Sequence, residues 1–105
     1  MTEQYSQDTD PYIKERLIEI KYNMAEIYRE KEDYSKAISL LEQIIESTKE
    51  KDERILYRSY FYLGNCYKMI ENYNSAREAY DAAENTDDDR LLARIEEARK
   101  DLPEE

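Results

Sequence analysis

Cys66 is the only cysteine of the chain, and cysteine is the side-chain type of highest intrinsic nucleophilicity. A catalytic thiol needs a base that takes up its proton, and the chain contains no histidine. A free cysteine more commonly packs as a small apolar side chain. We therefore expect Cys66 to be a buried or half-buried structural residue, and the sequence predicts a protein that is not an enzyme.

The 26 acidic residues are the other group that could do chemistry, as ligands of a cation or as an acid–base pair. The clusters "DTDP" (8–11) and "NTDDD" (85–89) lack the spacing, the central glycine and the terminal glutamate of a calcium-binding loop. Helix capping explains both clusters. A zinc site needs several Cys and His side chains, and a phosphate loop needs more than one glycine. We expect no metal and no cofactor.

The net charge of −10 argues against binding to nucleic acid and to anionic membranes, because both depend on clustered Lys and Arg. No apolar run approaches the roughly 20 residues of a membrane span, and the first residues, "MTEQYSQDTDP", do not resemble an export signal. A single cysteine fits a reducing compartment, so a cytoplasmic location is expected. A charged partner is expected to be basic.

Helical periodicity accounts for the remaining pattern, and no stretch alternates long enough to indicate a strand. Asp10-Pro11 is typical of a helix start. The sequence predicts an all-α fold of five helices. Their apolar faces carry Ile13, Leu17, Ile20, Met24 and Ile27 in the first helix, Tyr34, Ala37, Leu41 and Ile44 in the second, Leu56, Tyr60, Leu63, Tyr67 and Ile70 in the third, Tyr73, Ala76, Tyr80 and Ala83 in the fourth, and Leu91, Ile95, Ala98 and Leu102 in the fifth.

The first two helices resemble the next two at an offset of 39 residues. Such a period is typical of stacked helical hairpins. The pairs related by this offset are Met24 with Leu63, Ala25 with Gly64, Tyr28 with Tyr67, Glu32 with Glu71, Tyr34 with Tyr73, Ala37 with Ala76 and Leu41 with Tyr80. The small residues Ala25, Gly64, Ala37 and Ala76 are expected where two helices approach closely.

The run Tyr60-x2-Leu63-Gly64-x2-Tyr67, followed by Ala76-x3-Tyr80, resembles the tetratricopeptide pattern W-x2-L-G-x2-Y…A-x3-F. Tyr replaces Trp and Phe, Lys21 stands at the Trp position of the first repeat, and Lys49 and Asp88 replace the closing prolines. The resemblance implies a right-handed stack of antiparallel helix hairpins, an α-solenoid.

This organisation divides the chain into a polar lead-in that is expected to be disordered (1–10) and one domain (11–102). The domain comprises a first repeat (about 11–49), a second repeat (about 52–86) and a capping helix (about 88–102). Leu91, Ile95 and Ala98 are expected to cover the open end of the second repeat, while the N-terminal hairpin has no such cover.

Proteins of the resembled family bind a peptide or helix of a partner protein in a concave groove. Carried over position by position, the expected groove residues are Glu19, Tyr22, Glu26, Arg29 and Glu30 in the first repeat, and Arg58, Phe61, Tyr62, Asn65, Lys68 and Met69 in the second. The acids favour a ligand that is basic at one end and apolar in the middle. A clamp for a chaperone carboxylate is not expected, because Tyr22 and Glu26 replace its Lys and Asn.

Two alternatives to such an adaptor remain open. The uncovered apolar surface of the N-terminal hairpin could meet a second copy, which would make the chain a self-associating structural module. The chain could also be a segment of a longer repeat array.

Overall fold

The computed structural model describes residues 11–48 and 53–103, and in these two ranges every regular element is a helix. The helices are α1 (Pro11–Glu30), α2 (Tyr34–Thr48), α3 (Glu53–Met69), α4 (Tyr73–Ala83) and α5 (Asp89–Arg99). The all-α prediction with five helices is therefore confirmed for the described residues. The lead-in expected at residues 1–10 lies outside them.

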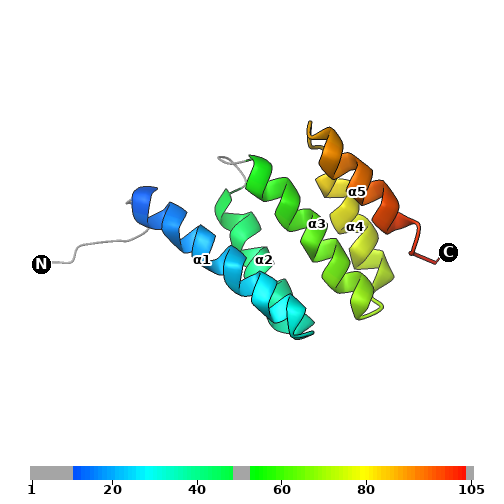
Figure 1. Ribbon diagram of the computed structural model, residues 1–105, viewed down its shortest axis with the longest axis horizontal. Coiled ribbons are helices and arrows are strands. Elements are labelled where there is room, and N and C mark those ends of the chain that lie inside the picture. The colour runs from blue at the N-terminus through cyan, green and yellow to red at the C-terminus, as the bar shows by residue number, and fades with distance from the viewer. Residues whose placement is uncertain (1–10, 49–52, 104–105) are drawn as a thin grey trace, which may run out of the picture.

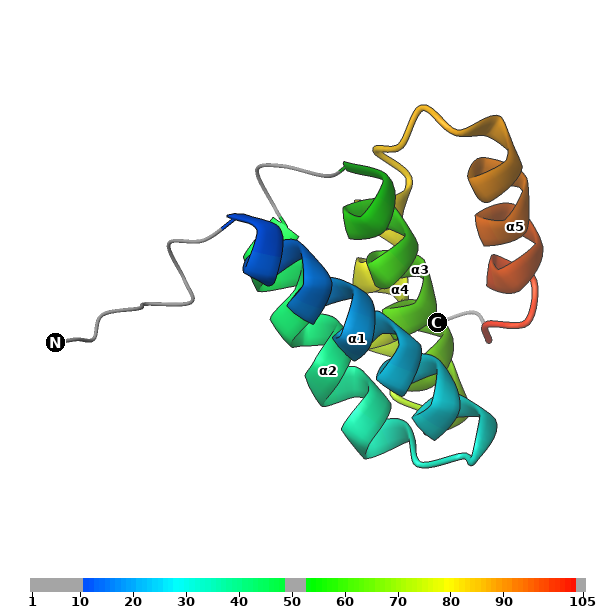
Figure 2. The same cartoon turned by 60° about the vertical axis from the view of Figure 1, so that its left-hand side comes forward.

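The helices stack in chain order as an α-helical repeat solenoid (Figure 1). α1 pairs with α2 and α3 pairs with α4 as hairpins, α2 packs on α3, and α5 covers α3 and α4. α1, α3 and α5 form one layer, and α2 and α4 form the layer behind it. The turned view places α1 and α5 at opposite ends of the stack (Figure 2).

The turns inside the two hairpins are copies of each other. Glu32 and Glu71 lie 39 residues apart, and both have a backbone φ of 65°, which is in the left-handed region that favours glycine. The amide of Glu32 donates to the carbonyl of Arg29 (3.0 Å) and that of Asp33 to Tyr28 (2.8 Å). In the second turn, Glu71 donates to Lys68 (3.0 Å) and Asn72 to Tyr67 (2.9 Å). This is the hydrogen bonding of a Schellman helix end, and it reverses the chain in both repeats.

Gly64 marks the close crossing of α3 and α4. A Cβ atom at Gly64 would lie 2.7 Å from Cε1 and 2.8 Å from Cδ1 of Tyr80, whose side chain is fully buried. The first repeat solves the same packing problem with Ala25 and Leu41, which are both buried. A smaller residue on one helix thus accompanies a larger one on its partner.

The core consists of two clusters. One joins α1, α2 and α3, with Ala79 of α4, around Ala37, Leu41 and Ile44. The other joins α3, α4 and α5 around Tyr80. Leu91 and Ile95 of α5 are buried in the second cluster, with Ala98 beside them, as predicted. α5 therefore closes the C-terminal end of the stack.

The apolar face predicted for the first helix exists, but it is not the face that packs in the core. Leu17, Ile20, Met24 and Ile27 are 39%, 49%, 39% and 50% exposed. Ile18 and Ala25 are the buried residues of α1, with Tyr22 and Tyr28 half-buried beside them. Periodicity identifies residues that share a face, but the neighbouring helices decide which face is covered. Within residues 11–48 and 53–103, the helices that pack on α1 lie on the side of α2 and α3.

Candidate functional site

Tyr62 is the centre of an aromatic and cationic cluster that joins the three helices of one layer. Its ring lies 5.9 Å from the ring of Tyr22 on α1, in an edge-on arrangement. The guanidinium carbons of Arg29 and Arg94 lie 5.1 Å and 6.0 Å from the centroid of the Tyr62 ring. These distances suit cation–π attraction, which holds the two arginines over the ring. α1, α3 and α5 therefore present a continuous surface, which we call the α1/α3/α5 face.

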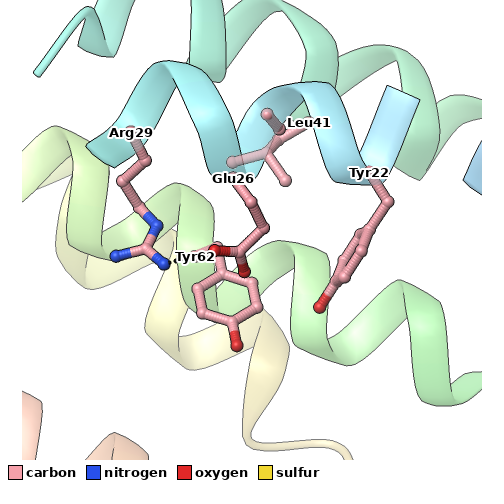
Figure 3. A pocket seen from close by; sticks show the side chains of 6 residues that line it. Tyr22, Glu26, Arg29, Leu41 and Tyr62 are labelled. Atoms are coloured by element: carbon pink, nitrogen blue, oxygen red, sulfur yellow. Dashed lines mark hydrogen bonds and ion pairs between the residues drawn. The ribbon is translucent and has the colours of Figure 1, made fainter. Parts of the chain in front are cut away.

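A notch opens on this face between the first two hairpins. Tyr22, Glu26 and Arg29 reach from α1 toward Tyr62, with Ala25 and Leu41 completing the lining (Figure 3). Its volume is about 10 Å³, enough for about one water molecule. The notch therefore suits a small protruding group of a larger ligand.

The charges in the notch are already paired. Arg29 donates a hydrogen bond of 2.6 Å to Glu26, and both side chains are about one-third exposed. Burial alone would lower the pKa of Arg29, but the hydrogen bond and the charge of Glu26 raise it overall. For Tyr22 the effect of burial has the opposite sign, because burial raises the pKa of a tyrosine hydroxyl, and the neighbouring Tyr62 raises it further. Tyr22 therefore stays a neutral hydrogen-bonding group.

A second hollow lies between α3 and α5. It has a volume of about 430 Å³ and is lined by Arg58, Asp88, Arg90, Leu91 and Arg94. The Asp88 carboxylate caps α5 by accepting from the amides of Arg90 (3.0 Å) and Leu91 (3.4 Å). Arg94 also lies 5.0 Å from the ring centroid of Phe61. Within the described ranges, none of the three arginine side chains forms an ion pair, so the hollow is a site of positive charge.

Phe61 corrects the predicted groove. It was expected to be open to a ligand, but it is only 4% exposed and packs in the core cluster with Tyr80, Leu91 and Ile95. α5 lies over it, because the capping helix occupies the side of α3 on which Phe61 projects. Phe61 is therefore a core residue.

Asn65 and Lys68 are engaged within the domain. Asn65 accepts a hydrogen bond from the Tyr80 hydroxyl. Lys68 Nζ donates to the carbonyl of Ala98 (3.2 Å) and lies 3.4 Å from the Asp101 carboxylate, so it ties α3 to the end of α5. These contacts give both side chains a structural role.

The remaining groove candidates lie outside both hollows. Met69 is 56% exposed at the end of α3. Glu19 and Glu30 are exposed on α1, and Glu19 lies 3.9 Å from Arg16. The structure thus brings together Tyr22, Glu26, Arg29 and Tyr62 at the notch, and Arg58 at the second hollow.

Arg90 and Arg94 line the second hollow, although the sequence did not predict them as groove residues. Their four-residue spacing on one helix was a signal that they share a side. That this side meets Arg58 depends on how α5 docks, and the repeat pattern does not contain that information.

Cys66 is fully buried, as expected for a structural residue. Burial raises the pKa of its thiol to about 11, although the charge of Arg29 acts in the opposite direction. The side chain is thus a neutral thiol near pH 7, unlike the thiolate of a nucleophilic cysteine.

The described residues contain no group of three or more His, Cys, Asp or Glu side chains placed to hold a metal ion. In the same part of the chain, none of the helices has the length and apolar character that crossing a membrane requires.

Comparison with protein-family models matches residues 16–89 to a model described as tetratricopeptide repeat. The matched range covers most of the chain. It includes α1 from Arg16 onward, all of α2, α3 and α4, and the first residue of α5. Comparisons with curated proteins and with solved structures gave no match.

Proposed function

Because the chain belongs to the tetratricopeptide repeat family, whose repeats generally mediate interactions between proteins, we propose that it is a non-catalytic adaptor that binds a segment of a partner protein on the α1/α3/α5 face. Stacked repeats commonly use such a layer as an extended binding surface. Tyr22 and Tyr62 supply flat apolar area with polar tips, and the notch between them receives one protruding group.

The observation that carries this proposal is the unpaired positive charge beside the aromatic cluster. The chain has 26 acidic and 16 basic residues, so an arginine can find an acidic partner easily. Arg58, Arg90 and Arg94 instead gather around one hollow without an ion pair among the described residues. An arginine fork held over an aromatic ring is well placed to bind a carboxylate with two parallel hydrogen bonds.

We infer a ligand segment of mixed charge. A carboxylate occupies the hollow between α3 and α5, and an apolar or aromatic side chain lies against Tyr22 and Tyr62. The basic character expected from the sequence belongs to the end of the segment near α1, where Glu19 and Glu30 are exposed. Glu26 contributes little to it, because Arg29 already neutralises its charge.

Peptide selection tests this proposal. A randomised peptide library selected on the wild-type protein should yield sequences with an acidic residue a few positions from an aromatic or apolar one. A selected peptide should lose at least tenfold in affinity toward the Arg58→Glu/Arg94→Glu variant, measured by fluorescence anisotropy. Tyr62→Ala should weaken binding as well.

A matched control carries the same change in charge on other elements. The variant Lys31→Glu/Lys36→Glu changes one residue in the turn between α1 and α2 and one residue in α2, which belongs to the other layer. Its affinity for the selected peptide should stay within about twofold of the wild-type affinity. Equal losses in the two charge-reversal variants would mean that only net charge matters and would contradict the proposal. Selection of peptides without acidic residues would contradict the role of the arginines.

A further inference from the structure

α1 carries a line of exposed apolar side chains along the side that faces away from α3. Leu17, Ile20, Met24 and Ile27 are between 39% and 50% exposed. Their spacing of three, four and three residues places them on one stripe about 15 Å long. Single exposed apolar residues are ordinary, but a continuous stripe is typical of an interaction surface. We call these four residues the α1 stripe.

The second repeat indicates what kind of surface the α1 stripe is. A shift of 39 residues converts the stripe into Leu56, Ser59, Leu63 and Cys66 of α3. These four are 8%, 0%, 7% and 0% exposed. Leu63 and Cys66 share a core cluster with residues of α2, the helix that packs on α3. The same side of the equivalent helix is thus a helix-packing surface, and among the described residues no helix covers it on α1.

We propose that the α1 stripe is a dimer interface in which α1 of one copy packs antiparallel on α1 of a second copy. The three–four–three spacing is that of the two core positions of a heptad repeat, which suits packing of one helix along another. A two-fold axis makes the interface self-complementary, with Leu17 against Ile27 and Ile20 against Met24 of the other copy. This inference does not depend on the peptide-binding face.

The charges beside the α1 stripe favour the antiparallel arrangement. Arg16 and Glu30 are exposed on the same edge of the stripe, one near each end. Antiparallel packing brings Arg16 of each copy beside Glu30 of the other, whereas parallel packing would bring Arg16 beside Lys21. On the other edge, the two Lys21 side chains approach each other and can turn apart into water.

The other end of the stack cannot serve as the partner surface. Arg90, Arg94, Glu96 and Glu97 are exposed on α5, and a stripe packed there would bury charges without partners. Contact between two α1 stripes therefore closes as a pair and does not propagate into a filament. One helix from each copy makes an interface smaller than the usual 1,600 Å² or so, so the dimer should dissociate on dilution.

Sedimentation velocity of the full chain across a wide concentration range tests the proposal. At about 0.15 M salt, which screens the net charge of −10 on each copy, the mass should rise from 12.7 kDa toward twice that value as concentration increases. Ile20→Glu/Met24→Glu should raise the dimer dissociation constant at least tenfold. Both side chains are exposed, so circular dichroism should report an unchanged helix content.

Two further variants make the test specific. Met69→Glu/Ile70→Glu changes two exposed apolar residues at the end of α3 and should leave dimerisation unchanged. Arg16→Glu should weaken the dimer, and Arg16→Glu/Glu30→Arg should restore it. A chain that stays at 12.7 kDa at every concentration, a dimer that survives Ile20→Glu/Met24→Glu, or a charge exchange that restores nothing would overturn the proposal.

Discussion

Gly64→Ala is expected to destabilise the wild-type protein but to stabilise a variant that already carries Tyr80→Leu. The added methyl group would lie 2.7 Å from the Tyr80 ring, whereas carbon atoms in ordinary contact are about 3.5–4.0 Å apart. The ring has little freedom to move, because it is fully buried and its hydroxyl donates to Asn65. Leucine at position 80 reproduces the arrangement of the first repeat, where Ala25 pairs with Leu41.

The magnitudes follow from two opposing effects. Overpacking of a tight crossing costs about 1–3 kcal/mol, and alanine is favoured over glycine inside a helix by about 1 kcal/mol. Gly64→Ala should therefore lower the free energy of unfolding of the wild type by about 0–2 kcal/mol. Without the ring only the helix preference remains, so the same change should add about 1 kcal/mol to Tyr80→Leu. Tyr80→Leu alone should cost about 2–4 kcal/mol through lost packing.

Urea unfolding of the wild type, the two single variants and the double variant measures this double-mutant cycle. The expected coupling is about 1–3 kcal/mol, with the dependence on urea concentration unchanged across the four proteins. Ala25→Gly is the control in the first repeat and should lose at least about 1 kcal/mol, through helix preference and through the loss of its buried methyl group. If Gly64→Ala has the same effect with and without the tyrosine ring, the close crossing does not explain why glycine stands there.

Three other predictions concern stability and reactivity. Glu71→Gly should stabilise the protein by about 1 kcal/mol in thermal unfolding, because glycine adopts the left-handed φ of 65° without strain. The control Glu78→Gly, at an exposed position inside α4, should destabilise the protein by a similar amount. A loss of stability in both variants would contradict the assignment of the turn at Glu71. Iodoacetamide at pH 8 should modify native Cys66 at least tenfold more slowly than the urea-unfolded chain, and fast native modification would contradict its burial. The thiol of Cys66 has a pKa near 9.0 in the unfolded chain, and burial raises its pKa to about 11 in the folded protein. The free energy of unfolding should therefore fall as the pH rises from 9 to 11. The Cys66→Ala variant should show a smaller fall over the same interval.

The repeat could be predicted from the sequence because small residues record close helix approaches directly. Ala25 and Gly64 stand at the same place in the two repeats, and the structure places each beside α2 or α4 as expected. The start of α5 was predictable because the acidic cluster at 85–89 is typical of a helix cap, and Asp88 accepts from the amides of Arg90 and Leu91.

The candidate site was less predictable because it depends on the relative placement of helices that are distant in the sequence. Phe61 and Tyr62 are neighbours in the chain, and only the docking of α5 decides that the first is buried and the second remains half-exposed. Arg58 and Arg94 meet for the same reason. The apolar face of α1 shows the same limit, because periodicity cannot tell whether a helix follows on the other side.

The order of the stack also determines where the native state opens first. Each helix packs mainly on its sequence neighbours, so an end helix can detach while the others keep their contacts. α5 is held at its C-terminal half partly by surface ion pairs, Arg99 with Glu84 and Lys68 with Asp101, which individually contribute little. Amide protons of α5 should therefore exchange with solvent through local fraying, whereas those of α3, enclosed between α2 and α4, should exchange only when the whole domain unfolds.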